Sequence, residues 1–63
     1  MKTYKDVSSG VYPISPDLES SPTTVYVRDN IREELREQQD GSQILFYVYD
    51  EVQYTREEWE AMQ

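Results

Sequence analysis

The side chains best suited to chemistry in this chain are carboxylates, because the sequence contains no His and no Cys. Those two absences remove the commonest general base, the thiol nucleophile and most transition-metal ligands. Asp50 and Glu51 are adjacent in an expected strand and so point to opposite faces, which does not suit shared acid–base work. Glu57 and Glu58 are more simply explained by a helix start. We therefore expect no catalytic residue and no enzyme.

Motifs that bind metals or phosphates are missing as well. The acidic residues Asp29, Glu33 and Glu34 lack the residue order of a calcium-binding loop. Gly10 and Gly41 each stand alone, which is typical of a turn and not of a phosphate-cradling loop. We expect neither a metal site nor a cofactor.

The charge of the chain bears on its partners. The 63 residues include thirteen acidic and six basic side chains, which gives a formal net charge of −7. Such a surplus repels a phosphate backbone, so we expect no nucleic-acid partner. The longest apolar run covers only residues 44–49, and the start has no hydrophobic signal region, so we expect no membrane partner and a cytoplasmic location.

The composition of the chain divides near Thr23. Residues 1–22 hold all three prolines and many serines, which predicts an extended, turn-rich segment. Partial disorder is one alternative there, and a pair of short strands at Tyr4–Val7 and Val11–Ile14 is another. Residues 23–63 are expected to form a hairpin plus helix domain. A domain of this size buries only about 60% of its unfolded surface, so we expect it to gain stability from self-association or from a protein partner.

Residues 29–39 are ambiguous between helix and strand. Their propensity favours a helix that ends at Gly41. Such a helix would have a narrow apolar stripe and like-charge pairs along its length. A period of two instead gives the apolar residues of each strand a single parity. In the first strand these are Val25, Val27, Ile31 and Leu35, and in the second they are Ile44, Phe46, Val48 and Val52. A two-residue type I′ turn at Asp40 and Gly41 then completes a hairpin, and the helix remains the alternative.

The type I′ turn fixes a register between the two expected strands. It sets Leu35 opposite Phe46, Glu33 opposite Val48 and Ile31 opposite Asp50. On the other face it sets Tyr47 across from Glu34 and Tyr49 across from Arg32. Tyr and Arg are enriched at protein interfaces. We therefore take one shared face as the candidate interface, formed by Arg32, Arg36, Tyr47 and Tyr49; the alternative is that the rings are covered by residues 1–22.

A short helix is expected at the C-terminus. Thr55 and Glu58 have the spacing of a capping box, while Tyr54 and Trp59 have that of a hydrophobic staple. The whole pattern predicts an α+β fold, a small antiparallel β-hairpin or meander with a short C-terminal α-helix.

Two strings of residues carry a resemblance: residues 21–32 (SPTTVYVRDNIR) and residues 49–59 (YDEVQYTREEW), with the Asp40-Gly41 turn between them. They resemble a group of short proteins encoded in phages and prophages of Gram-positive bacteria, among tail and lysis genes. The resemblance implies a non-enzymatic accessory protein that acts by protein contact, in tail assembly or as a minor virion component. It places the chain in the bacterial host cytoplasm or the virion. The alternative is an acidic inhibitor that mimics nucleic acid and blocks a host protein.

Overall fold

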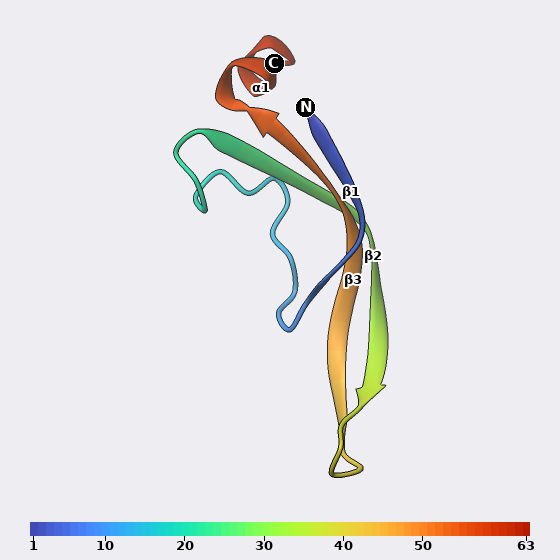
Figure 1. Ribbon diagram of the computed structural model, residues 1–63. Coiled ribbons are helices and arrows are strands. Elements are labelled where there is room, and N and C mark those ends of the chain that lie inside the picture. Colours follow the sequence, from blue (N-terminus) through green and yellow to red (C-terminus); the bar gives the residue numbers. More distant parts are fainter.

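The computed structural model describes residues 1–63 and consists of one antiparallel sheet followed by a short helix (Figure 1). The elements are β1 (Lys2–Ser9), β2 (Thr24–Glu37), β3 (Gln43–Thr55) and α1 (Arg56–Ala61). The strand order is β1-β3-β2, so the most apolar strand lies in the centre. The α+β class is confirmed in this coarse form, with β structure dominant. The connection is not a meander, because β1 pairs with β3 and not with β2.

The hairpin between β2 and β3 exists, and residues 29–37 belong to a strand. The alternative helix over residues 29–39 is therefore wrong. Pairing with β3 continues along β2 as far as Glu37 opposite Gln43. This cross-strand pairing overrides the helix propensity of the Glu- and Arg-rich segment, whose apolar stripe was too narrow to hold a helix on the sheet.

The turn of this hairpin differs from the expected type I′ pair. The Gln38 N–H donates to the Ser42 carbonyl at 2.7 Å, and the Gly41 N–H donates to the Gln38 carbonyl at 3.0 Å. Gly41 has φ +86°, whereas Asp40 is not among the residues with positive φ. The connection is thus a three-residue loop with Gly41 in the left-handed region. The Asp40 carboxylate stabilises it by accepting hydrogen bonds from the Ser42 N–H at 2.9 Å and hydroxyl at 2.6 Å.

The longer loop moves the register by one residue, which corrects the expected pairs. Leu35 lies opposite Leu45 and not Phe46, Glu33 opposite Tyr47 and not Val48, and Arg32 opposite Val48 and not Tyr49. Glu34 lies opposite Phe46, and Asp50 lies opposite Asp29 instead of Ile31. Because side chains alternate between faces, this step moves the β2 side chains from Arg32 to Glu37 to the other face relative to β3. A further shift between Asp29 and Arg32 adds a second step, so residues 24–29 keep the face that the sequence predicts.

Both outer strands carry a bulge at the level of Asp50. One extra residue is inserted in β1 between Tyr4 and Val7, and one in β2 between Asp29 and Arg32. Asp6 (φ 55°) and Asn30 (φ 52°) take the left-handed conformation there, which Asp and Asn tolerate best among residues with a side chain. The Asp50 carboxylate contacts both bulges, accepting from the Asp6 N–H at 3.4 Å and from Asn30 Nδ2 at 3.2 Å.

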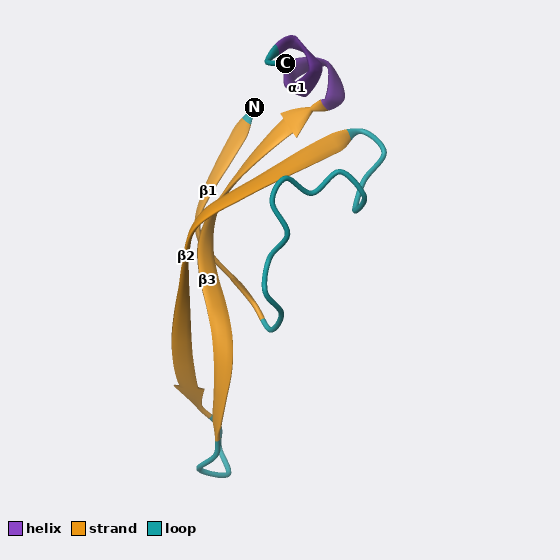
Figure 2. Cartoon of the chain, turned by 180° about the vertical axis from the view of Figure 1, so that it is seen from behind, coloured by secondary structure: helices purple, strands orange, loops and turns teal.

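The sheet changes direction along its length and gives the molecule an elongated shape of 48 × 19 × 15 Å (Figure 1). β1 reaches only as far as Tyr47 of β3. Beyond that point the β2–β3 hairpin continues as a two-stranded ribbon, residues 34–46, which we call the arm. Figure 2 shows the arm projecting away from the end of the molecule that holds α1.

The N-terminal residues join the same sheet. The expected pairing of Tyr4–Val7 with Val11–Ile14 is wrong, because β1 pairs with β3 and residues 11–14 form no strand. The expected division of the chain at Thr23 lies just before β2, and segments on both sides of it contribute strands to the same sheet. Residues 10–23 cross over one face of the sheet (Figure 2) and form a single bridge to it, between Asp17 and Tyr26.

The C-terminal helix begins as the sequence predicts. The Thr55 hydroxyl accepts from the Glu58 N–H at 3.1 Å, and the Glu58 carboxylate accepts from the Thr55 N–H at 2.9 Å, which completes the capping box. The Tyr54 and Trp59 rings contact with centroids 6.1 Å apart, which confirms the staple. Val25, opposite Tyr54, is the one fully buried side chain. This helix is short, and the structure holds no helix with the length and apolarity needed to cross a membrane.

Candidate functional site

The four residues expected to share an interface lie on opposite faces of the sheet. Arg32 pairs with Val48 and Arg36 with Ile44, so both arginines are on the face that carries Val48, which we call the valine face. Tyr47 and Tyr49 alternate with Val48 and so belong to the other face, the tyrosine face. The expected common face is corrected for a physical reason, the one-residue shift that Gly41 introduces.

The tyrosine face is covered by the connection between β1 and β2. Tyr49 is only 6% exposed. The Tyr12 ring meets the Tyr47 ring edge-on, with centroids 5.3 Å apart and planes at 75°. The structure thus has the alternative arrangement, in which the rings lie beneath residues 1–22. Neither ring presents an open binding surface.

The two arginines of the valine face are held by neighbours in the chain. The Arg36 guanidinium lies 4.7 Å from the centroid of the Phe46 ring and donates to the Glu34 carboxylate at 2.9 Å. Arg32 forms an ion pair with Asp6 across the sheet and donates to the Asn30 carbonyl at 2.9 Å. Both side chains remain about 40% exposed, so their outer surfaces stay available for a further contact.

The most buried charged group of the molecule is a cluster centred on Arg28. Its Nε donates to Glu51 at 2.8 Å, and its Nη1 donates to Asp17 at 3.0 Å and to the Ile14 carbonyl at 3.2 Å. The guanidinium also lies 5.0 Å from the Tyr26 ring centroid. Burial disfavours the charge, but Glu51 and Asp17 outweigh burial and raise the pKa of Arg28.

Asp17 is the acidic residue that ties the connection to the sheet. Its carboxylate accepts from the Ser20 hydroxyl at 2.6 Å, from the Ser20 N–H at 3.1 Å and from the Glu19 N–H at 3.1 Å. These hydrogen bonds hold the pKa of Asp17 far below its ordinary value of 3.8, and the bond from the Ser20 hydroxyl has the largest effect. Arg28 lowers the pKa in the same direction. Hydrogen bonds to the ionised form have this effect even when burial opposes it.

The Arg28 cluster has the properties of a structural clamp. The Arg28 guanidinium bonds only to groups of this chain, and its positive charge is shared between the Asp17 and Glu51 carboxylates. A second arginine has a similar role, because Arg56 Nη2 donates to the Leu18 and Ser21 carbonyls, the latter at 3.1 Å. Two arginines from the sheet and the helix start therefore fix the connection over the tyrosine face.

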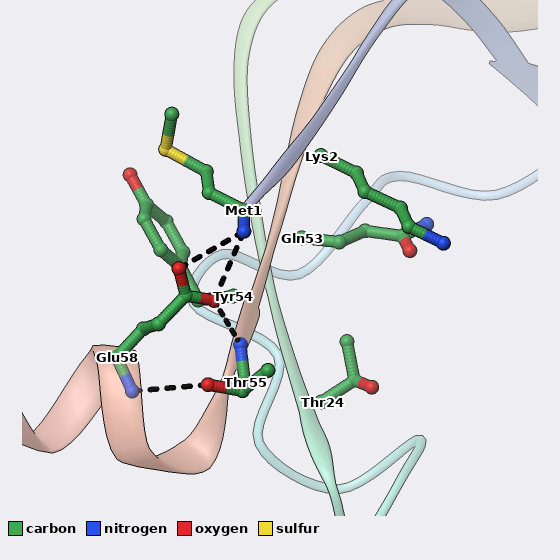
Figure 3. A pocket seen from close by; sticks show the side chains of 7 residues that line it. All are labelled: Met1, Lys2, Thr24, Gln53, Tyr54, Thr55 and Glu58. Carbon is green, nitrogen blue, oxygen red and sulfur yellow. Dashed lines mark hydrogen bonds and ion pairs between the residues drawn. The ribbon is translucent and has the colours of Figure 1, made fainter.

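A small pocket of about 200 Å³ lies between the start of β1 and the helix (Figure 3). Figure 3 shows the Glu58 carboxylate pointing at the Met1 amino group and at the Thr55 N–H. The hydrogen bond from the Thr55 N–H lowers the pKa of Glu58 most, and the bond from the Met1 amino group lowers it further. The Glu58 carboxylate, the one acidic group of this pocket, is therefore already engaged as part of the capping box. No three His, Cys, Asp or Glu side chains gather anywhere to hold a metal ion.

Exposed apolar side chains occur on the arm and on the connection, where Val11, Tyr12 and Ile14 are 72%, 64% and 64% exposed. Leu35 is 63% exposed, Ile44 45% and Leu45 37%. Leu35 and Leu45 form a cross-strand pair on the tyrosine face, beyond the reach of the covering connection, and Ile44 lies on the valine face. Exposed apolar residues grouped on a projecting element are typical of an interaction surface.

Reasoning from the sequence missed this surface and the Arg28 cluster. The signal for the arm was present: the apolar run at residues 44–46 follows the turn directly, where a hairpin has no third strand. The Arg28 cluster gave no comparable signal, because Asp17 and Glu51 lie far apart in the sequence. Glu51 meets Arg28 through the β2–β3 register, and Asp17 reaches it through the bridge to Tyr26.

Comparison of the chain with protein-family models, with curated proteins and with solved structures gives no match.

Proposed function

We propose that this chain is a non-enzymatic accessory protein of a phage or prophage, which acts by protein–protein contact in tail assembly or as a minor virion component. The observation that carries the contact role is the arm, which projects from the rest of the chain, here called the body (Figure 1). Leu35, Ile44 and Leu45 are exposed on the arm. The phage assignment is supported by the resemblance of residues 21–32 and 49–59. Its sites of action would be the host cytoplasm and the virion.

Outside the arm, exposed apolar side chains lie on the connection, at Val11, Tyr12 and Ile14. The tyrosine face of the body is covered by residues 10–22, and α1 packs over Tyr54 through Trp59. The arm carries three acidic residues, Glu34, Glu37 and Asp40, against one basic residue, Arg36, and combines its apolar side chains with the Glu34–Arg36 ion pair. Interfaces are centred on apolar and aromatic residues with a polar rim, and the arm matches that composition.

The alternative role, an acidic mimic of nucleic acid, finds less support. A mimic needs a continuous array of carboxylates on one face. Here the acids alternate with arginines, and the pairs Arg28–Glu51, Arg32–Asp6 and Arg36–Glu34 neutralise them locally. Contact through the arm is therefore the function we propose.

The test compares an arm variant with a matched surface variant. The double variant Leu35→Lys/Leu45→Lys adds charge to the arm, and Val11→Lys adds it to a residue that is 72% exposed on the connection. Tagged proteins would be expressed in host cells during prophage induction, cross-linked and captured, and the purified particles would be probed for the chain.

We expect cross-links that map to residues 34–46 in the wild type and in Val11→Lys, and their loss in the double variant. Equal capture by all three proteins, or cross-links confined to the body, would show that the arm is not the contact surface. Absence of the chain from the particles, with arm-dependent capture retained, would restrict its role to assembly in the cytoplasm.

A further inference from the structure

The edges of the sheet differ in how well they are protected. Unpaired strand edges template further pairing unless charges, bulges or Pro block them. The outer edge of β1 carries Lys2 and Lys5 and the bulge at Asp6. The outer edge of β2 carries the bulge at Asn30 and, further along, five charged residues among positions 32–37, interrupted by Leu35.

A third edge has none of these devices. β1 ends opposite Tyr47, so the side of β3 from Gln43 to Phe46 has no neighbouring strand. This segment, Gln-Ile-Leu-Phe, contains no charged residue and no Pro in a chain of net charge −7. The last pair of β1 is Ser9 opposite Tyr47, and the arm extends beyond the connection that follows (Figure 1).

The orientation of the peptide groups along β3 can be established from both of its ends. The Ser42 carbonyl accepts from Gln38, and the Arg56 N–H donates to Thr23 at 3.2 Å, so even-numbered residues direct their peptide groups to β2. Both bulges insert their extra residue in the partner strands, and the alternation along β3 is unbroken. The N–H and C=O of Gln43 and Leu45 therefore point to the open edge.

We propose that this edge binds a second copy of the chain, β3 against β3 in antiparallel orientation. A two-fold axis through Ile44 would set Ile44 opposite Ile44 of the second copy and Gln43 opposite Leu45 of the second copy. This register uses the N–H and C=O of Gln43 and Leu45 in each copy. It joins the two arms into one four-stranded sheet.

The second copy is the occupant because the segment is complementary to itself. A two-fold contact requires the same patch on both subunits, and an uncharged patch avoids the repulsion that any other edge of this acidic chain would impose. The projecting arms also keep the acidic bodies well apart along a molecule 48 Å long, far beyond the screening length of about 8 Å at physiological salt. Pairing covers Ile44 and Leu45.

This inference rests on the proposed function, since it names a partner for the arm. The contact is confined to a four-residue edge and its side chains, which places it in the class of small, weak interfaces. We therefore expect a dimer that dissociates on dilution, and a pairing that becomes lasting where many copies are held close together.

The first test is sedimentation over a wide concentration range with three variants. Gln43→Pro removes an N–H from the open edge while leaving the β2–β3 ladder intact, because that N–H does not point to β2. Leu45→Lys places a charge on the same edge. Leu35→Lys is the matched control, since it changes a more exposed leucine on the strand away from the edge.

We expect the wild type and Leu35→Lys to dimerise with similar dissociation constants, and the other two variants to dimerise at least about tenfold more weakly. Circular dichroism and amide spectra confirm that each variant keeps the sheet, and Leu45→Lys decides the matter if Gln43→Pro does not fold. A wild type that stays monomeric at millimolar concentration, or a loss of dimer in Leu35→Lys equal to that in Leu45→Lys, would overturn the proposal.

Amide hydrogen exchange supplies an internal control within the wild type. The Leu45 amide should become protected as concentration rises, whereas the Ile44 amide, which bonds within the hairpin, should not change. Concentration-independent exchange at Leu45 in a protein that does dimerise would place the interface elsewhere. A monomeric chain whose arm still cross-links to another protein would refute the edge pairing and leave the proposed function standing.

Discussion

Replacing Arg28 with Met should unlock the connection from the sheet, because it removes the charge between Asp17 and Glu51 while retaining most of the side-chain length. The Arg28 side chain is 15% exposed, and those of its partners are 6% and 10% exposed. Removal of one member of a buried ion pair costs about 3–5 kcal/mol, since the remaining charge is left uncompensated.

The lower end of that range applies here. Asp17 keeps its hydrogen bonds from Ser20 and Glu19, and Glu51 keeps the Gln53 side-chain amide at 3.1 Å. We therefore expect a loss of about 3 kcal/mol. A chain of this length has a total stability of roughly 3–9 kcal/mol, so the variant should be partly unfolded at room temperature or close to it.

Urea unfolding followed by the fluorescence of Trp59, the single tryptophan, measures the loss. Arg32→Met is the control, because its ion pair with Asp6 is largely exposed and should contribute less than about 1 kcal/mol. Equal effects of the two substitutions would refute the clamp. So would an Arg28→Met protein that keeps the contact between the Tyr12 and Tyr47 rings in NMR spectra.

The effect of Arg28→Met should also depend on pH. In the wild type the lowered pKa of Asp17 contributes stability that is present above the ordinary value of 3.8 and is lost as pH falls below it. Without Arg28 the folded protein binds that proton more readily and loses less stability in acid. The difference between wild type and variant should therefore narrow below pH 4, and a constant difference would show that charge is not the cause.

Three further substitutions test local features by urea unfolding. Gly41→Ala should cost about 1 kcal/mol because φ is +86° there, while Gly10→Ala, also in open space, should be close to neutral. Thr55→Ala should cost about 1 kcal/mol through loss of the cap, and Thr55→Ser should restore it. Asn30→Gly should be tolerated at φ 52°, whereas Asn30→Ile should cost about 1–2 kcal/mol; equal effects of Gly and Ile would contradict the bulge geometry.

Local chemistry in the sequence was sufficient to predict the elements whose causes are local. The capping box and staple need only Tyr54 to Trp59, and both are present. The hairpin is predicted because the apolar residues from Val25 to Leu35 share one parity and those from Ile44 to Val52 share the other. Its register was missed, since a loop of two or three residues around Gly41 satisfies the same sequence, and only the conformation of Asp40 distinguishes them.

Features that depend on distant residues could not be predicted in the same way. β1 pairs with the far end of the chain, Lys2 opposite Gln53, and no local pattern reports such a partner. The candidate interface depended on the register, so one step separated Arg32 and Arg36 from Tyr47 and Tyr49. The Arg28 cluster likewise joins distant residues, because the β2–β3 register sets Glu51 opposite Arg28 and a bridge to Tyr26 brings in Asp17.

The position of Asp50 explains why body and arm behave as different parts of one sheet. Its carboxylate accepts a hydrogen bond from a bulge on each side of β3. Beyond it β1 continues only to Ser9, opposite Tyr47, while β2 and β3 extend further. A two-stranded ribbon is marginal in water by itself, and here it is held by the body at one end and by the contact of Arg36 with Phe46 on one face. The apolar residues Leu35, Ile44 and Leu45 lie where the chain has nothing left to cover them. A further strand at the β3 edge would supply both the missing pairing and the missing cover, which is why a single partner can satisfy the arm.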